Sequence, residues 1–223
     1  MKERKKMMKK VVVFDSGFGG ELFADYVEKE LPIVEVIRII DWRNLDVITK
    51  NPKEARNVTE KAIRPYVGHT DLIIFANYLI TFMDLKYFQE KYPNQKFMGF
   101  AMPQIKSRKT LVLTSSALSR TIKYKAFIHK LHLKVKTLDC DKWIPLIDDA
   151  ELTEEHVRKD LERIKNFSPS SIALVYTNFI DIKPILLKIF GPIVHINDGY
   201  HETLRNVCLE LGLRGLDGKR AKH

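Results

Sequence analysis

Short, wholly apolar runs alternate along the chain with longer segments whose apolar residues have helical spacing. The first apolar run is Val11–Phe14, and Asp15-Ser16-Gly17-Phe18-Gly19-Gly20 follows it. Four consecutive apolar residues are typical of a strand that is buried on both faces of a parallel sheet. The glycines allow a sharp turn into a helix, which the spacing predicts over residues 21–31. Asp15 and Ser16 are therefore expected at the carboxyl end of a central strand, where open α/β sheets bind ligands.

The same alternation continues to the end of the chain. It indicates a mostly parallel α/β architecture with right-handed crossovers, in which the segment around 102–108, with Pro103, separates two halves of similar pattern. Further strands are expected at 36–41, 71–76, 97–101, 110–114, 133–138, 172–176 and 194–196, and helices at 52–66, 82–91, 120–130, 153–165, 182–190 and 200–211.

The glycine turn after the first strand differs from the two common nucleotide-binding motifs. Leu22 stands where a dinucleotide-binding fingerprint needs its third glycine, and no Gly-Lys-Ser/Thr follows as in a Walker loop. The backbone N–H groups of such a turn still suit an anion. An alternative is that the glycines only let the helix pack closely against its strand.

Composition and charge narrow the class of protein. The chain has 223 residues, of which 45% are hydrophobic and 30% charged, so it can bury a substantial core. A formal net charge of +10 would suit a protein that binds nucleic acid. Much of that charge lies in two terminal segments without interleaved aromatic residues, so nucleic-acid binding is not expected. The terminal basic residues are Lys2, Arg4, Lys5, Lys6, Lys9, Lys10, Lys219, Arg220, Lys222 and His223.

Cysteine usage and hydropathy predict a cytoplasmic protein without a disulfide framework. The two cysteines, Cys140 and Cys208, have no CxxC spacing, so neither a zinc site nor another metal site is expected, and both are predicted to be small buried hydrophobes. The basic amino terminus lacks the apolar core of a signal peptide, and no apolar run has the length of a membrane span. No contact with a membrane is therefore expected.

The segment Asp15–Gly20 resembles the DSGxGG signature of glutamate racemases, in the aspartate/glutamate racemase superfamily. Further segments resemble that family in the same order over nearly the whole chain. They are Leu31-Pro32 with the strand at 36–41, Lys50-Asn51-Pro52-Lys53-Glu54, Phe97–Pro103, Leu113–Ile128 with Arg120 and Tyr124, Ile182-Lys183-Pro184 and Ile196-Asn197-Asp198-Gly199.

The resemblance implies a fold of two pseudo-symmetric, doubly wound parallel-sheet halves with the site in the cleft between them. Because the family's last helix returns to the first half, residues 1–101 with 198–223 are expected in one half and 102–197 in the other. It also implies a cofactor-independent amino-acid racemase, in which one cysteine thiolate removes the α-proton and a second cysteine returns a proton to the opposite face. Family members are often dimers, so a homodimer is an expectation here.

The sequence departs from the family at both catalytic positions. Ala76-Asn77-Tyr78 stands where the family has CNT, and Tyr176-Thr177-Asn178 stands where it has CTH. Both thiols and the histidine that assists the second are therefore missing. Ala76 carries no titratable proton, and the phenol of Tyr176 would need strong stabilisation to act as a base, since its ordinary pKa is near ~10. The family's substrate-binding PYG segment is replaced by Asp46-Val47-Ile48.

A set of polar residues survives as a candidate binding site. Hydroxyl, amide and backbone N–H groups can hold a carboxylate, while Asp15 can pair with an ammonium group. The alternative is that these residues only cap their own turns and helices. Tyr78 and Tyr176 are bulkier than the residues they replace, so they are expected to narrow or fill the pocket. The predicted substrate-binding residues are Asp15, Ser16, Asn77 and Thr177, with Asn178 as a polar substitute for the histidine.

Three functional interpretations follow. In the first, the chain is a pseudoenzyme that binds a small amino or carboxylic acid as a sensor or regulatory subunit. In the second, it is an active isomerase that uses other bases, such as Tyr176 with Asp15, and supplies D-glutamate to the cell wall. In the third, it is an interaction protein whose basic surface meets nucleic acid or an acidic partner, with a vestigial pocket.

Overall fold

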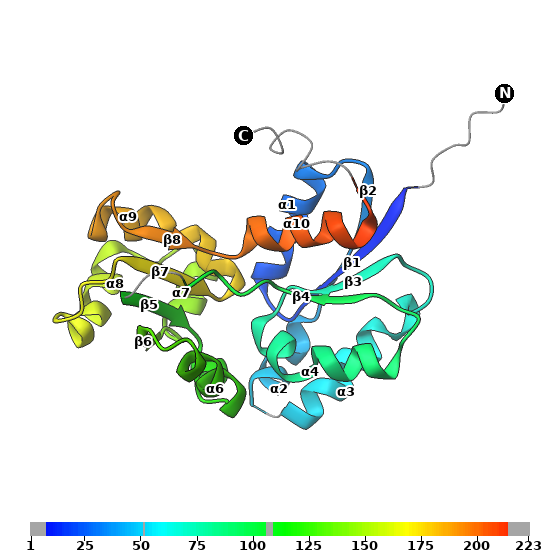
Figure 1. Cartoon of the computed structure of the whole chain (residues 1–223), viewed down its shortest axis with the longest axis horizontal. Helices are drawn as coiled ribbons and strands as arrows, with labels where there is room; N and C mark the ends of the chain where they lie inside the picture. The colour runs from blue at the N-terminus through cyan, green and yellow to red at the C-terminus, as the bar shows by residue number, and fades with distance from the viewer. Residues whose placement is uncertain (1–7, 51, 106–108, 214–223) are drawn as a thin grey trace.

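The computed structural model describes residues 8–50, 52–105 and 109–213, and two parallel sheets lie side by side in it (Figure 1). The first sheet has the order β2-β1-β3-β4, with β1 (Lys9–Asp15), β2 (Val34–Ile40), β3 (Leu72–Phe75) and β4 (Phe97–Gly99). The second has the order β6-β5-β7-β8, with β5 (Lys109–Thr114), β6 (Lys134–Asp139), β7 (Ser171–Val175) and β8 (His195–Asn197).

The two sheets repeat one topology. In each, the first strand of the sheet in chain order pairs with the second on one side and the third on the other, and every pairing is parallel. Parallel neighbours require a crossover connection, and helices supply it. The predicted fold of two pseudo-symmetric, doubly wound α/β halves is confirmed.

The first apolar run forms the centre of the first sheet. All four residues of Val11–Phe14 have no exposed surface. Val11 and Val13 belong to one buried cluster, while Val12 and Phe14 belong to another on the opposite face of the sheet. A strand covered on both faces reads as a continuous apolar run, because successive side chains point to opposite faces.

Helices surround both sheets. In the first half they are α1 (Phe18–Glu30), η1 (Trp42–Asn44), α2 (Leu45–Lys50), α3 (Pro52–Ile63), η2 (Arg64–Tyr66) and α4 (Tyr78–Lys91). In the second half they are α5 (Ser116–Ser119), α6 (Ile122–Lys130), α7 (Trp143–Asp148), α8 (Glu154–Leu161), η3 (Glu162–Ile164), η4 (Thr177–Ile182) and α9 (Lys183–Phe190).

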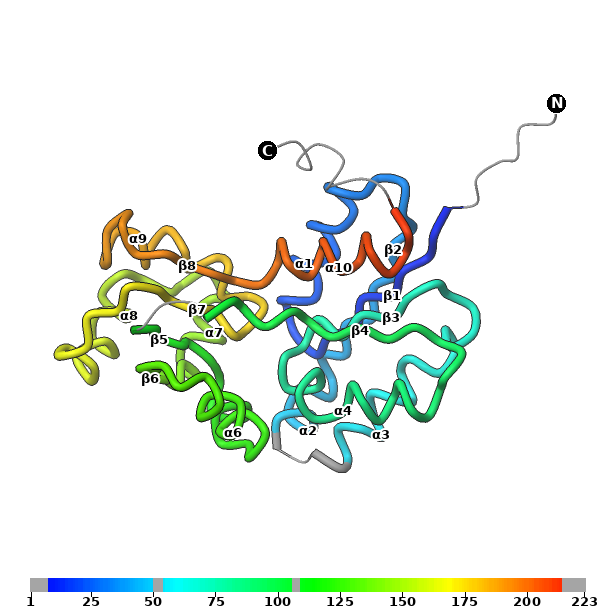
Figure 2. Tube along the Cα trace, viewed as in Figure 1, coloured from blue at the N-terminus to red at the C-terminus, as the bar shows by residue number. Residues whose placement is uncertain are grey.

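The last helix, α10 (Tyr200–Leu211), returns from the second sheet to the first half and lies beside α1 (Figure 2). The ring centroids of Phe23 on α1 and Tyr200 on α10 are 5.5 Å apart, and Ala101 N donates to Thr203 Oγ1 at 2.9 Å. The buried cluster that contains these rings also includes Val112 and Val175 of the second sheet. The halves therefore share one apolar core, while the exact domain boundaries stay a prediction.

Local chemistry explains where the helices differ from the sequence-based expectation. The predicted helix at 120–130 is α6 and begins at Ile122, because Thr121 caps it through a 3.1 Å hydrogen bond from Tyr124 N. The short helix α5 precedes this segment and was not expected. The predicted helix at 52–66 ends at Ile63 and continues as a 3₁₀ turn that contains Pro65, which has no N–H to donate. The short helices α2 and α7 were not expected.

No helix within the described ranges combines the length and the apolar character needed to cross a membrane. The expected basic terminal segments fall mainly outside the described residues, with only Lys9 and Lys10 inside them.

Candidate functional site

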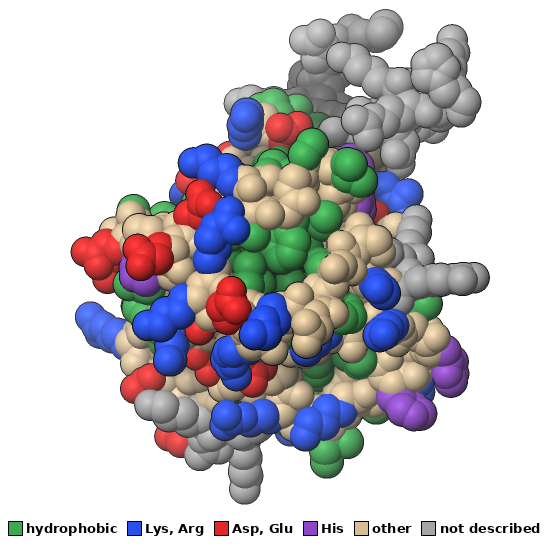
Figure 3. All heavy atoms as spheres, turned by 90° about the vertical axis from the view of Figure 1, so that its left-hand side faces the viewer, with side chains coloured by type: hydrophobic (Ala, Val, Ile, Leu, Met, Phe, Trp, Pro, Cys, Tyr) green, Lys and Arg blue, Asp and Glu red, His purple; other side chains and the backbone are tan. Residues whose placement is uncertain are grey.

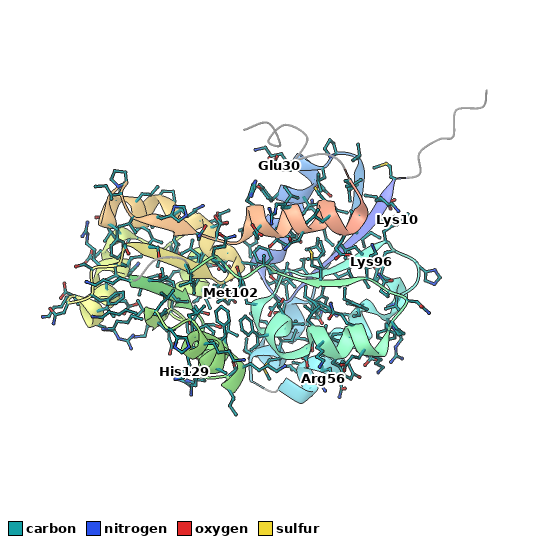
Figure 4. The ribbon with its side chains drawn as sticks, in the orientation of Figure 1. Lys10, Glu30, Arg56, Lys96, Met102 and His129 are labelled. Atoms are coloured by element: carbon teal, nitrogen blue, oxygen red, sulfur yellow. The ribbon has the colours of Figure 1, made fainter. Side chains whose placement is uncertain are left out.

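The carboxyl ends of β1, β3 and β7 meet between the two halves, next to the connection that carries Met102 (Figure 4). Asp15 is the last residue of β1, Asn77 follows β3, and Thr177 follows β7. The structure brings these three residues together from positions far apart in the sequence. Parallel strands place such residues at one edge of their sheet, and the two sheets face each other at this edge.

Asp15 is the hydrogen-bond acceptor at the centre of the site. Its Oδ1 accepts from Ser16 N at 2.6 Å and from Asn77 Nδ2 at 2.8 Å, and its Oδ2 accepts from Thr177 Oγ1 at 3.3 Å. The side chain is buried, and this burial raises the pKa of Asp15 to about 7, although the hydrogen bonds from Asn77, Ser16 and Thr177 act to lower it. Asp15 therefore exchanges its proton near neutral pH.

The glycines of the Asp15–Gly20 segment let three chain segments approach closely. A Cβ atom on Gly19 would lie 2.1 Å from Thr177 Oγ1 and 2.8 Å from Asn178 N. A Cβ atom on Gly20 would lie 2.4 Å from the Cβ of Asp15. Close packing of α1 against the start of η4 and against the end of β1 therefore explains these two glycines, in agreement with the alternative that they let the helix pack closely.

Asn77 has a structural role as well as a place in the site. Its Oδ1 caps α4 by accepting from Ile80 N at 3.1 Å. Its Nδ2 donates to Asp15 and also lies 3.3 Å from Ser16 Oγ. Asn77 therefore caps its own helix, as the alternative to a binding role predicts. Its amide NH₂ group is still directed at Asp15.

Ala76 and Tyr176, at the positions where the resemblance predicts cysteines, carry no group that ionises readily at neutral pH. Ala76 has no exposed surface and no ionisable group. Tyr176 packs its ring 5.0 Å from the ring of Phe179, and burial followed by the charge of Asp15 raises the pKa of the Tyr176 phenol above its ordinary value. The phenol is therefore protonated at neutral pH.

The segments at the carboxyl ends of β1, β3 and β7, residues 15–16, 76–78 and 176–178, are called the tips below. The hydroxyl of Tyr78 joins the tip after β3 to two other segments. The hydroxyl lies 3.2 Å from the carbonyl oxygen of Ala101 and 3.1 Å from that of Asp198. Burial raises the pKa of Tyr78 well above its ordinary value, so this phenol stays a donor. Tyr78 thus fills space beside the inner end of the site, as the sequence predicts for a bulky residue at this position.

The tips enclose a small cavity of about 20 Å³, which we call the inner cavity. That volume holds about one water molecule. The tip residues that line it are Asp15, Ser16, Asn77, Tyr78, Tyr176 and Thr177.

A larger cavity of about 630 Å³, the outer cavity, adjoins it. Tyr176, Thr49 and Ser115 line both cavities, so the phenol stands between them.

Asn178 is not brought to the inner cavity. Its Nδ2 donates to Asp148 Oδ1 on α7 at 2.6 Å, and its buried Oδ1 has no hydrogen-bond partner in the part of the chain that the structure describes. Its side chain thus belongs to the contact between η4 and α7. The residues Asp46-Val47-Ile48, which are predicted to stand at the place of PYG, lie on α2, where Ile48 lines the inner cavity and Asp46 lines the outer one.

The other candidate groups lie away from the tips. Cys140 and Cys208 are both buried free thiols, as expected, and burial raises the pKa of Cys140. Neither lines the inner cavity. No cluster of three or more His, Cys, Asp or Glu side chains with metal-binding geometry occurs among residues 8–50, 52–105 and 109–213.

A further cavity of about 470 Å³ lies at the far end of the second half, between α8, η3 and α9, and shares no residue with the tips. Figure 3 looks onto this end and shows a hollow of hydrophobic side chains with charged ones around it.

Glutamate racemases are among the known proteins to which this chain is similar in sequence and in structure. No family model matches the chain. A glutamate racemase of Streptococcus mutans is 23% identical over 221 residues, which cover 92% of this chain and 83% of that protein. The Escherichia coli glutamate racemase, solved with L-glutamate and an activator, aligns with a TM-score of 0.78 at 17% identity over 94% of this chain and 84% of that one. The Francisella tularensis glutamate racemase, solved with D-glutamate, gives a TM-score of 0.75 at 18% identity, with coverage of 94% and 84%.

Proposed function

We propose that this chain, which has the fold of the aspartate/glutamate racemase superfamily and is similar in sequence to glutamate racemases, binds a small amino or carboxylic acid between its halves without two-thiol racemisation. The observation that carries the proposal is the pair Ala76 and Tyr176. One has no ionisable group, and the pKa of the other is raised, so neither supplies a thiolate. A sensor or regulatory subunit is the role that fits binding without this reaction.

The polar residues at the tips support binding in the cleft. Asp15, Asn77 and Thr177 come from both halves, and they offer a carboxyl, an amide and a hydroxyl to one small region. A ligand that contacts both halves would stabilise their closed arrangement. The inner cavity has the volume of about one water molecule, so it leaves no room to hold an α-carbon at Asp15 and Tyr176 for proton removal.

A second candidate is an active isomerase with non-cysteine bases, and the pKa of Asp15 favours it. A carboxyl with a pKa of about 7 is suited to act as a general base at neutral pH, and the protonated phenol of Tyr176 could return a proton. Both residues line the inner cavity. In that case the chain would supply a D-amino acid, such as D-glutamate for peptidoglycan.

The test is α-proton exchange with a matched binding measurement. The purified protein is incubated in deuterated buffer with each enantiomer of glutamate, aspartate, leucine and phenylalanine and followed by proton NMR, and thermal unfolding is recorded at rising concentrations of each. We expect the α-proton signals to persist while at least one amino acid raises the melting temperature saturably.

Loss of an α-proton signal, absent from a heat-inactivated control, would contradict the proposal and support the isomerase. The variants Asp15→Asn and Tyr176→Phe would then show which group acts as base, because each removes one proton acceptor or donor. An isomerase whose activity survives both changes would exclude this pair.

A further inference from the structure

The outer cavity has the size and the mixed lining of a ligand site. Its volume of about 630 Å³ falls within the range of pockets that bind small molecules. Residues of α2 in the first half and of α5 and α7 in the second half line it, and the ring of Tyr176 forms the side toward the inner cavity. A ligand here would contact both halves, as a ligand in the inner cavity would, but in a space large enough to hold it.

One guanidinium provides the anion-binding group of this cavity. Arg120 follows α5, its side chain is exposed, and it makes no ion pair or side-chain hydrogen bond with any residue that the structure describes. A guanidinium offers two parallel N–H donors that match the two oxygens of a carboxylate. Arg120 is therefore available to a ligand carboxylate.

Two carboxylates line the same cavity. Asp141 accepts from Ser116 N at 2.8 Å through Oδ1, which holds the carboxylate at the start of α5, and Asp46 lies on α2. Asp46 has a further interaction of its own, so the charge balance of the cavity rests on Arg120 and Asp141, which carry one positive and one negative charge. This balance suits a ligand that carries an ammonium as well as a carboxylate, and it disfavours a second carboxylate such as that of glutamate or aspartate.

Apolar groups complete the lining. Ile144 and Pro145 of α7, Leu45 of α2 and the ring of Tyr176 surround the charged groups. Such surfaces bury an aliphatic or aromatic side chain with favourable free energy, at about 25 cal/mol per Å² of apolar area removed from water.

We propose that the outer cavity binds a zwitterionic α-amino acid with an apolar side chain, its carboxylate on Arg120, its ammonium toward Asp141, and its side chain against Tyr176 and Ile144. This assignment rests on the proposed function and deepens it, because it states where the ligand lies and of which class it is. It also gives the substitution at position 176 a role, since a cysteine there would leave the cavity without an aromatic wall.

The experiment is calorimetric titration of the full chain with L-leucine, L-phenylalanine, their D-enantiomers and L-glutamate. The variants are Arg120→Gln, Ser16→Ala and, as a matched control, Arg158→Gln, which removes an exposed arginine on α8. We expect an apolar amino acid to bind more tightly than glutamate. We expect Arg120→Gln to weaken it by about ten-fold or more, since a charge-assisted hydrogen bond is lost, and Arg158→Gln to leave it unchanged.

The outcomes separate the two proposals. Binding that survives Arg120→Gln but is lost in Ser16→Ala would place the ligand in the inner cavity and overturn this inference while leaving the proposed function intact. Tighter binding of glutamate than of the apolar amino acids would overturn the ligand class. No binding of any amino acid by the unmodified protein would contradict the proposed function itself, and this inference with it.

Discussion

Thr177 of the second half donates its hydroxyl proton to Asp15 of the first half, with Thr177 Oγ1 3.3 Å from Asp15 Oδ2. This hydrogen bond joins the two sheets through two residues that are 162 positions apart in the chain. The other carboxyl oxygen, Asp15 Oδ1, accepts hydrogen bonds from Asn77 Nδ2 and from Ser16 N. The protonation of Asp15 is therefore coupled to the contact between the halves.

Asp15 is predicted to make the protein less stable as the pH rises from about 4 to about 7. Its pKa is raised by burial from 3.8 to about 7, so over this range the native state binds more protons than the unfolded state. The free energy of unfolding then falls with pH, by on the order of 4 kcal/mol over the whole window for one group shifted this far, and levels off above it. Denaturant unfolding at several pH values measures the slope.

The control is Asp15→Asn, whose side chain does not titrate and can keep the same geometry. The slope between pH 4 and 7 should be less negative in the variant than in the unmodified protein. Parallel slopes for the two proteins would show that Asp15 is not the group responsible.

Gly19→Ala is predicted to destabilise the protein, while Gly17→Ala is not. A Cβ on Gly19 would lie 2.1 Å from Thr177 Oγ1, and Thr177 cannot simply turn away without losing its hydrogen bond to Asp15. Overpacking of this kind typically costs about 1–3 kcal/mol. A Cβ on Gly17 would meet no atom within 4 Å.

Thermal unfolding of both variants checks this pair. Equal melting temperatures for Gly19→Ala and Gly17→Ala would mean that the halves separate freely at this contact, contrary to the packing described.

Tyr78→Phe is predicted to lower stability by about 1–2 kcal/mol, because the partly buried carbonyl oxygens of Ala101 and Asp198 lose their phenol donor. The matched control is Tyr26→Phe. Tyr26 also packs its ring against Phe23 and Tyr200, but its hydroxyl makes no hydrogen bond within the described ranges.

Urea unfolding of the two variants makes the comparison, since each change removes one oxygen and keeps the ring. A loss of stability as large in Tyr26→Phe as in Tyr78→Phe would refute the assigned role of the Tyr78 hydroxyl.

Glu60 is predicted to raise the free energy of unfolding as the pH rises, whereas Asp15 is predicted to lower it. Hydrogen bonds from Lys91, at 2.7 Å to each carboxylate oxygen, and from Tyr92 and Arg64 lower the pKa of Glu60 to about 2 despite some desolvation. Its contribution to stability is therefore present above pH 4.5 and is lost as the pH falls toward 2.

The variant Glu60→Gln should be less stable than the unmodified protein at pH 6, and the difference should shrink below pH 4. Unfolding followed by circular dichroism at pH 3 and pH 6 measures it. A difference that does not change with pH would mean that the ion pairs around Glu60 contribute nothing to stability.

The secondary structure was predictable wherever the pattern was long or wholly apolar. Val11–Phe14 is a central buried strand, and the predicted helix at 200–211 is α10. The helices α2 and α7 were missed because six-residue helices have too few turns to show a helical period, and Pro145 lies within α7. The start of α6 at Ile122, two residues after the predicted start, depends on the cap at Thr121.

The candidate site was predictable in part. The positions of Asp15, Asn77 and Thr177 at strand ends follow from the order of apolar runs, and the structure brings them within hydrogen-bonding distance. Asn178 adjoins Thr177 in the sequence, but its side chain points to Asp148 because η4 turns it toward α7. No signal in the sequence indicates that direction.

The α/β architecture and the type of group expected at each strand end follow from the sequence, because they depend on residue type and on periods of two to four residues. The size of the inner cavity, the raised pKa of Asp15 and the outer cavity with Arg120 and Asp141 follow from the tertiary structure. Volume, burial and the meeting of distant charges arise from how whole helices and sheets pack, and residues far apart in the chain determine them jointly.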